Sequence, residues 1–263
     1  MINSPANNLN DIGIVFVGPI IGITPSLIDT FKPIVDQGAT LIGVDIFDDS
    51  YERKTFWKII KLTMHPRAHS NRIKFANSFP EHKVFDKIRD AINQLLQQGK
   101  KKIVLGGMSG GFIFAGRIIQ SPPDQEVREH SVYELRRHVV GLFGISPLIF
   151  YPPGVHRPDV SLKLIPPKIQ TLLFFSDGDD IIPPGTRENA ELSAKTYSHI
   201  KVRHLKCGEF PNKSKSIKHQ YFGGRDFIRP LKNVFWHPEA EACTMDMVHA
   251  LLKELALIEN KNG

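Results

Sequence analysis

A serine at position 109 stands in a short glycine-rich stretch that can support nucleophilic catalysis. The residues Gly107-Met108-Ser109-Gly110-Gly111 fit the pattern G-x-S-x-G. An apolar run of strand length precedes them, and the apolar run 112–119, which can be helical, follows them. A serine on a sharp turn between strand and helix is a nucleophile elbow, in which the hydroxyl group stands clear of the sheet. The alternative is a glycine-rich turn whose serine only caps the helix.

A nucleophilic serine needs a base, and the base needs a carboxylate that orients it. Three aspartates, Asp177, Asp179 and Asp180, directly follow the apolar run 169–175. We favour Asp179, because the sequence from Asp179 to Pro183 places this aspartate in a turn while two isoleucines pack against the body. The alternative is an acidic turn before a helix N-terminus, where the helix dipole favours negative charge.

The base is expected to be a histidine in the loop after the last strand. His219 lies in the middle of the long polar loop 206–230, and His237 directly precedes the closing helical pattern. We favour His219 as the base and keep His237 as the alternative, since the position of His237 directly before the helix also suits a residue that acts merely as the helix N-cap. Three other histidines lie before or inside predicted elements: His199, His204 and His249.

Apolar runs and amphipathic patterns alternate along the chain. The runs of strand length cover 12–17, 39–47, 101–106, 139–145, 169–175 and 200–205. Helical patterns cover 24–37, 84–96, 112–119, 186–197 and 238–257. Strands that alternate with helices predict an α/β fold with a mostly parallel central sheet and helices on both faces. We expect the first two strands to be buried on both faces, because their apolar runs are nearly continuous.

Single residues predict where some of these elements begin and end. Thr24 is expected to cap the first helix, with Pro25 at its first position. Pro33 conflicts with a continuous helix and predicts a kink. The lysine run Lys100-Lys101-Lys102 leads into the elbow strand, and we expect it to be solvated. Pro238 is expected at the first position of the closing helix.

The chain of 263 residues is long enough for one large α/β domain, and no linker divides it. We therefore expect a single domain over 1–263, in which the less regular residues 51–80 form a candidate lid or cap segment. Within this segment, residues 54–64 have a basic amphipathic pattern. The pattern predicts either a helix packed on the body or a weak contact with a membrane or lipid.

Charge and cysteine content bear on partners and compartment. The net charge of +7 and the isoelectric point of about 9.3 suit an anionic partner or a solvated basic surface. We expect no nucleic-acid partner, because the basic residues come in short clusters without a nucleic-acid-binding motif. No Cys/His spacing indicates a zinc site. Two cysteines make no disulfide framework, and we see no signal peptide and no run of roughly 18 apolar residues, so we expect a cytoplasmic protein.

The chain resembles the α/β-hydrolase superfamily, and within it the dienelactone hydrolase family, over most of its length. Gly18-Pro19-Ile20-Ile21-Gly22-Ile23 and Val44-Asp45-Ile46-Phe47 are similar to that family's opening βαβ unit. The elbow matches the family's G-x-C-x-G-G pattern, with Ser109 in the place of the cysteine. His219-Gln220-Tyr221-Phe222 resembles the family's H-G-F, and Phe235-Trp236-His237-Pro238 resembles the segment that opens its last helix.

The resemblance implies a serine hydrolase with the α/β-hydrolase fold that acts on a small-molecule ester or thioester. Ser109 would be the nucleophile, His219 the base and Asp179 the acid that orients it. The family carries a glutamate where this chain has Pro19, which is compatible with a serine and histidine mechanism. Since Pro19 has no N–H, the second oxyanion donor beside Gly110 would be the N–H of Ile20. The mechanism requires no cofactor and no metal. The strand 104–109 is also similar to acyl-protein thioesterases and carboxylesterases.

Two other functions fit the same sequence. An acyltransferase on this scaffold would pass the acyl group to an alcohol other than water. A non-catalytic hydrolase-like protein would use the basic residues within 53–74 to hold an anionic surface, and its binding would fall with salt. Nothing in the sequence indicates an oligomeric state.

Overall fold

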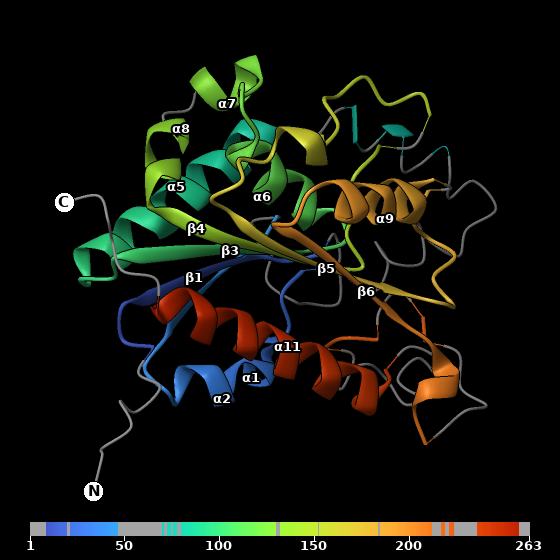
Figure 1. Ribbon diagram of the computed structural model, residues 1–263. Helices are drawn as coiled ribbons and strands as arrows, with labels where there is room; N and C mark the ends of the chain where they lie inside the picture. Colours follow the sequence, from blue (N-terminus) through green and yellow to red (C-terminus); the bar gives the residue numbers. More distant parts are fainter. Residues whose placement is uncertain are drawn as a thin grey trace, which may run out of the picture.

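A parallel sheet forms the centre of the protein. The computed structural model describes residues 9–19, 22–46, 70, 73–74, 76–77, 80–129, 132–151, 153–183, 185–211, 217–218, 221–223 and 236–257. Its sheet has six strands in the order β2-β1-β3-β4-β5-β6 (Figure 1). The strands are β1 (Ile12–Val17), β2 (Thr40–Val44), β3 (Lys102–Met108), β4 (Val139–Ile145), β5 (Gln170–Ser176) and β6 (Ile200–Leu205). All of the pairings in this sheet are parallel, so the prediction of a parallel sheet is confirmed.

Helices cover both faces of this sheet (Figure 1). One layer contains α5 (Glu81–Gln97), α6 (Gly111–Ile119), α7 (Gln125–Glu129), α8 (Val132–Leu135) and α9 (Thr186–Thr196). The other layer contains α1 (Pro25–Thr30), α2 (Lys32–Val35) and α11 (Pro238–Leu257). Short 3-10 turns are η2 (Arg136–His138), η3 (Leu162–Leu164) and η4 (Cys207–Glu209). The buried side chains form one hydrophobic core on each side of the sheet, as helices on both faces require.

The first helical segment follows its sequence signals closely. Thr24 is extended, and its hydroxyl oxygen accepts a hydrogen bond from the Leu27 N–H at 3.1 Å, while Pro25 opens α1. The conflict at Pro33 is resolved by a break, since α1 ends at Thr30 and α2 begins two residues later. Phe31 stands at the break, and its ring packs 5.0 Å from the ring of Phe16 in β1.

The second strand differs from its prediction as a strand buried on both faces. All residues of β1 are buried, but in β2 only Val44 is buried. β2 is shorter than the predicted 39–47 and lies at the edge of the described sheet. A strand at an edge has a neighbour on one side only, so its side chains are less completely covered than those of a central strand. The apolar run alone could not reveal that position.

Two of the lysines expected in solvent are bound to the backbone. Lys102 is 5% exposed, and its Nζ donates hydrogen bonds to the carbonyl oxygens of Leu255 and Ala256 at 3.0 and 2.9 Å. These carbonyls belong to the last turn of α11, where they lack helical partners and carry the negative end of the dipole. Lys100 Nζ donates to the carbonyl oxygens of Asn10 and Gly38 at 2.7 and 2.9 Å. The prediction of a solvated lysine run is therefore wrong for Lys102, whereas Lys100 is only partly buried.

A buried cluster of charges ties α6 to two neighbouring helices. Arg117 in α6 is fully buried, with Nη1 2.6 Å from Glu81 Oε2 at the start of α5. Its Nε and Nη2 donate to the two carboxylate oxygens of Asp124 at 2.8 and 3.0 Å, and the guanidinium lies 5.1 Å from the centre of the Phe85 ring. Tyr151 Oη donates a hydrogen bond to the other Glu81 oxygen. Burial lowers the pKa of Arg117, but the hydrogen bonds and charges of Asp124 and Glu81 raise it above its ordinary value, so the arginine stays charged.

Most of the candidate lid segment 51–80 lies outside the described residues. This includes residues 54–64, for which a lipid contact was predicted, and that contact stays a prediction. Among the helices that the structure describes, none is both long enough and apolar enough to cross a membrane.

We expect Arg117→Ala to lower the free energy of unfolding by about 3–5 kcal/mol, because it leaves two carboxylates in the interior without their main cation. The matched control is Arg89→Ala on α5, whose partly exposed ion pairs with Asp86 and Asp90, at 2.7 and 3.0 Å, contribute about 1 kcal/mol or less. Urea unfolding followed by circular dichroism measures both variants. Equal losses in the two variants would contradict a special role for the buried cluster.

Candidate active site

Ser109 occupies a tight turn between a buried strand and a buried helix. β3 ends at Met108 and α6 begins at Gly111, so Ser109 and Gly110 make the whole connection. Ser109 has a φ of 53°, a left-handed conformation that residues other than glycine rarely adopt. Its N–H donates to the carbonyl oxygen of Ile145 in β4 at 3.0 Å, and its own carbonyl oxygen accepts from the N–H of Leu148 at 3.1 Å. The chain after β4 therefore holds the strained residue in place.

The two motif glycines allow this turn through close packing. A Cβ atom on Gly107 would lie 2.5 Å from the Cα of Phe112, on the first turn of α6. A Cβ atom on Gly111 would lie 2.3 and 2.4 Å from the carbonyl oxygens of Val17 and Gly18, at the end of β1. Gly110, which lies between Ser109 and Gly111, has a helical φ of −59° and open space around its Cβ position. The glycines of G-x-S-x-G are thus required by the approach of backbone to backbone.

The elbow lies where the order of the strands reverses. β1 and β3 are neighbours, with β2 on the outer side of β1 and β4 on the outer side of β3. In open α/β sheets, ligands bind at this switch point, beyond the carboxyl ends of the strands. Gly110 is the N-cap of α6, at the positive end of the helix dipole, where a backbone N–H can stabilise an anion. Ile20, the other predicted oxyanion donor, lies outside the described residues.

The structure separates the roles of Asp177 and Asp179. Asp177 binds the end of β5 to the end of β6, because its Oδ2 accepts the N–H of Cys207 at 2.9 Å and its own N–H donates to the carbonyl oxygen of Leu205. Burial raises the pKa of Asp177, but hydrogen bonds from Cys207 and Ile217 bring it below its ordinary value. Asp179 Oδ1 accepts the N–H groups of Ile181 and Ile182 at 3.1 and 3.3 Å, which fixes the turn that follows β5. The turn expected from the sequence around Asp179 is present.

The elbow and the Asp179 turn both lie at the carboxyl ends of the parallel strands. Met108 in β3 is level with Ile145 in β4, and Ile145 is level with Phe174 in β5. Adjacent strands are about 4.8 Å apart, so the ends of β3 and β5 are separated by about 10 Å. An imidazole between the two side chains can span a gap of this order.

His219 and Gln220 lie outside the described residues, but the chain on either side of them is described. Ile217 accepts a hydrogen bond at its carbonyl oxygen from the N–H of Gly178, the residue before Asp179, at 3.1 Å. Tyr221 is fully buried, and burial, Cys243, Asp179 and Glu241 together raise the pKa of its hydroxyl, although the hydrogen bond with Thr244 lowers it. The described chain before His219 therefore contacts the Asp179 turn through Ile217.

Glu241 in α11 fixes the segment that follows His219. Its Oε2 accepts the N–H of Gly223 at 2.6 Å and the indole N–H of Trp236 at 3.2 Å. The carbonyl oxygen of Gly223 accepts the hydroxyl of Ser26 in α1 at 3.0 Å. Glu239 and Glu241 both lie in the first turn of α11, and no local signal in the sequence distinguishes them. Only the fold reveals that its carboxylate is buried against the loop.

His237 belongs to the start of α11. Its ring is buried, 5.3 Å from the ring of Phe210, and its Nδ1 accepts the N–H of Ala240 at 3.3 Å. The same nitrogen lies 3.2 Å from Glu239 Oε2. This is the N-cap geometry that the sequence offered as the alternative for His237. Its Nδ1, the nitrogen that an orienting aspartate would bind, is engaged by the helix.

His199, His204 and His249, the three histidines that lie before or inside predicted elements, each contact another part of the protein. His199 Nε2 is 3.1 Å from the carbonyl oxygen of Ile165, and His249 Nε2 is 2.7 Å from Gln37 Oε1. His204 lies in β6, 3.3 Å from Arg187 Nη1, and its pKa is lowered by burial and by that arginine. Within the described part of the chain, no group of three or more His, Cys, Asp or Glu side chains could hold a metal ion.

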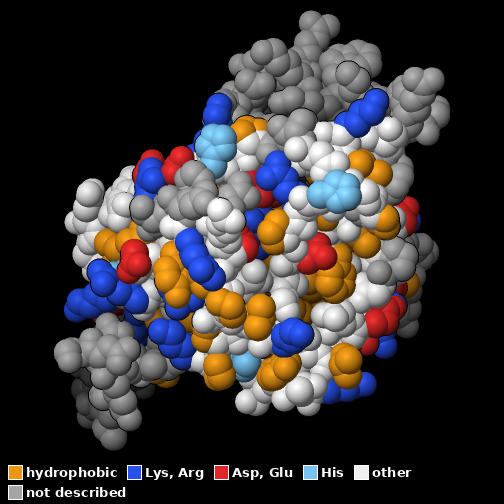
Figure 2. Space-filling model, turned by 90° about the horizontal axis from the view of Figure 1, so that it is seen from above, with side chains coloured by type: hydrophobic (Ala, Val, Ile, Leu, Met, Phe, Trp, Pro, Cys, Tyr) orange, Lys and Arg blue, Asp and Glu red, His pale blue; other side chains and the backbone are white. Residues whose placement is uncertain are grey.

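Charged side chains are mixed on the face above α7, α8 and α9. Figure 2 shows lysine and arginine there among acidic and hydrophobic side chains, without a continuous basic stripe. The segment 53–74, to which a binding role was given as an alternative, lies almost wholly outside the described residues.

Comparison with known proteins shows the fold. No family model matches the sequence, and no curated protein matches it. A protein from Klebsiella pneumoniae named as a dienelactone hydrolase aligns with a TM-score of 0.59 at 12% identity, over 95% of this chain and 89% of that one. A carboxylesterase from Lactobacillus plantarum aligns with a TM-score of 0.56 at 13% identity, over 94% and 88%. Esterase 2 from Thermogutta terrifontis, phosphonylated by cyclosarin, aligns with a TM-score of 0.52 at 14% identity, over 99% and 88%.

These alignments extend over nearly the whole of each chain, and the sheet is parallel with helices on both faces. The protein has the α/β-hydrolase fold, as expected from the resemblance of its sequence.

We expect Gly111→Ala to lower the free energy of unfolding by at least about 2 kcal/mol, because its methyl group would overlap two carbonyl oxygens that cannot move without shifting β1. Gly110→Ala is the matched control, since the new methyl group enters open space at a helical φ, and its stability is expected to stay within about 1 kcal/mol of wild type. Thermal and urea unfolding measure the difference. A Gly111→Ala protein as stable as Gly110→Ala would show that the elbow is not tightly packed against β1.

Proposed function

We propose that this protein is a serine hydrolase that cleaves carboxylic esters or thioesters through an acyl-enzyme intermediate. The observation that carries the proposal is the left-handed backbone of Ser109 between a buried strand and a buried helix. A serine is strained in that conformation, and the strain is understandable where it presents a nucleophile at the edge of the sheet. The names of the solved structures with this fold, which are esterases and a dienelactone hydrolase, support ester hydrolysis.

In the proposed reaction, Ser109 Oγ attacks the carbonyl carbon of the substrate while His219 takes the serine proton. The oxyanion accepts hydrogen bonds from the N–H groups of Gly110 and Ile20, each of which contributes about 3 kcal/mol in the transition state. The tetrahedral intermediate expels the alcohol or thiol, which receives the proton from His219. A water molecule then attacks the acyl-enzyme by the same steps and releases the carboxylic acid. Asp179 keeps the imidazole in the required tautomer and orientation.

Three contacts support His219 over His237 as the base. The carbonyl oxygen of Ile217, two residues before His219, binds the N–H next to Asp179. Tyr221, two residues after His219, is held in the core by a hydrogen bond to Thr244 at 2.9 Å. His237 Nδ1 is used by the first turn of α11, which leaves no place there for an orienting aspartate.

Labelling with a fluorophosphonate probe tests the nucleophile and the base together. We expect Ser109→Ala to abolish labelling and His219→Ala to slow it by about a hundredfold or more, because the serine loses its base. His237→Asn should label within a few-fold of the wild-type rate, since asparagine retains an oxygen that can cap α11. The phosphonylation of the T. terrifontis esterase 2 supports the choice of probe. Labelling that survives Ser109→Ala, or wild-type protein that is folded and unlabelled, would refute the proposal.

The two aspartates give a second test. We expect Asp179→Asn to lower kcat for a p-nitrophenyl ester by about 10²–10⁴, as loss of the orienting carboxylate does in a serine triad. Asp177→Asn should retain kcat within a few-fold and lose about 1 kcal/mol of stability, because its hydrogen bond to the Cys207 N–H is weakened when the acceptor is neutral. The opposite result, a larger loss of kcat in Asp177→Asn, would exchange the two roles.

A further inference from the structure

A cavity lies at the end of the molecule away from Ser109. It has a volume of roughly 450 Å³ and is bounded by α8, by η2 and by the end of α6. Cavities of this size hold small organic ligands. Its floor is apolar, because Ile119 and Ile169 line it and each is only 1% exposed.

Three cations surround this floor. Arg136, Arg137 and Lys168 line the cavity, and none of them forms an ion pair within the part of the chain that the structure describes. Arg137 Nε is hydrogen-bonded only to the ring of His138, at 3.1 Å. The one carboxylate among the described lining residues, Glu134, is exposed and unpaired with these cations.

Arg136 is held in a fixed position with an unused donor. Its guanidinium lies 3.7 Å from the centre of the Tyr133 ring, which lines the same cavity. Stacking on an aromatic ring restricts the side chain and leaves the N–H groups of the guanidinium edge available to an acceptor. Nη1 of Arg136 is buried and has no hydrogen-bond partner. A buried N–H without an acceptor is costly.

The cavity is distinct from the candidate active site. Ser109 follows the carboxyl end of β3. Ile169 precedes β5 and η2 precedes β4, so the cavity lies at the amino ends of the parallel strands, opposite the end at which Ser109 lies. The two places lie at opposite ends of α6, a helix about 13 Å long that starts beside Ser109 and ends at Ile119.

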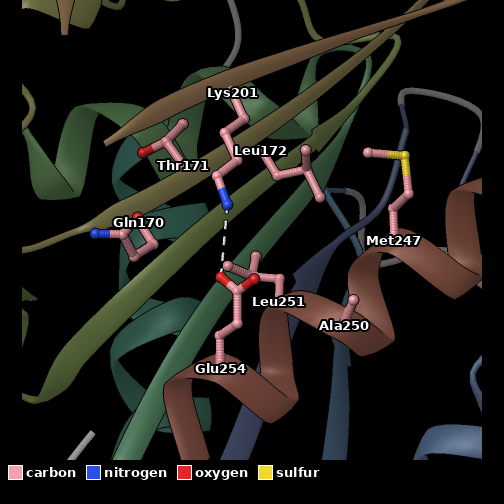
Figure 3. A pocket seen from close by; sticks show the side chains of 8 residues that line it. All are labelled: Gln170, Thr171, Leu172, Lys201, Met247, Ala250, Leu251 and Glu254. Atoms are coloured by element: carbon pink, nitrogen blue, oxygen red, sulfur yellow. Dashed lines mark ion pairs between the residues drawn. The ribbon is translucent and has the colours of Figure 1, made fainter. Parts of the chain in front are cut away.

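A second cavity lies between β5, β6 and α11, and it differs from the first in how its cation is paired (Figure 3). It also contains a lysine, Lys201, but its Nζ is 3.5 Å from Glu254 Oε2 across the cavity. The charge of Lys201 is therefore already balanced by the protein. Unlike this second cavity, the cavity beside η2 combines an apolar floor with cations that the described residues leave unbalanced.

We propose that the cavity beside η2 is a second ligand site, which binds a small organic anion. The phosphate or carboxylate group binds Arg136, Arg137 and Lys168, and the apolar body of the ligand lies against Ile119 and Ile169. This site is independent of the chemistry proposed for Ser109.

Calorimetric titration with phenyl phosphate tests the proposal, at fixed ionic strength and in a buffer without other multivalent anions. Inorganic phosphate supplies the charge without the ring, and benzyl alcohol supplies the ring without the charge. We expect saturable binding of phenyl phosphate by wild type and at least tenfold weaker binding of each of the other two compounds. Arg136→Gln and Lys168→Gln should each weaken phenyl phosphate about tenfold, because each removes a charge-assisted hydrogen bond. Lys201→Gln is the control and should change the affinity less than twofold, since that lysine lines the other cavity.

Several outcomes would overturn the site. They are no saturable binding by wild type, an affinity unchanged in both Arg136→Gln and Lys168→Gln, and equal binding of inorganic phosphate and phenyl phosphate. Loss of binding in Ser109→Ala would place the probe at the elbow and would also refute the site. Should Arg136→Gln unfold because the contact with Tyr133 is lost, Lys168→Gln decides, because Lys168 is exposed and forms no ion pair with described residues.

Discussion

The contact between Gly111 and the end of β1 controls the geometry of the whole site. The first residue of α6 approaches the carbonyl oxygens of Val17 and Gly18 so closely that no side chain fits between them. The helix can reach that position only if the connection from β3 is very short, and a short connection requires the left-handed conformation of Ser109. Two backbone hydrogen bonds, to the carbonyl oxygen of Ile145 and from the N–H of Leu148, then hold Ser109 on the side of β4. The proposed nucleophile is therefore positioned by three strands and one helix, all of them in the core.

The residues proposed for catalysis are supported from opposite sides of the sheet. α6 lies in one layer and presents Ser109, while α11 and α1 lie in the other layer and hold the chain that follows His219. Asp179 lies at the carboxyl edge between these supports, in a turn fixed by its own carboxylate. Such an arrangement makes the relative position of base and nucleophile depend on the packing of both layers on one sheet. Glu241 has a central place in it, because one carboxylate joins Gly223, Trp236 and α11.

Local signals predicted the elements well, and partners distant in sequence account for what they missed. Thr24, Pro25 and Pro33 act on their own neighbours, so their effects could be predicted from the sequence. Lys102 caps a helix more than a hundred residues away, and Arg117 meets Glu81 and Asp124 only after three helices have packed together. The edge position of β2 depends on the order of the strands, which no single apolar run encodes. For the proposed site, the motif indicated Ser109 and the turn indicated Asp179, whereas the contacts that favour His219 come from residues on either side of it.

β6 ends the described sheet on the side opposite β2, and its composition bears on solubility. An exposed strand edge is a template for pairing with another chain, which is a common route to aggregation. Lys201 and Arg203 alternate along β6 and form ion pairs with Glu254 and Glu209. Adding a strand from a second molecule at this edge would take these ion pairs out of water, and the cost of removing charged side chains from water opposes that pairing. The charged side chains of β6 therefore disfavour the addition of a further strand at the edge that the described strands form.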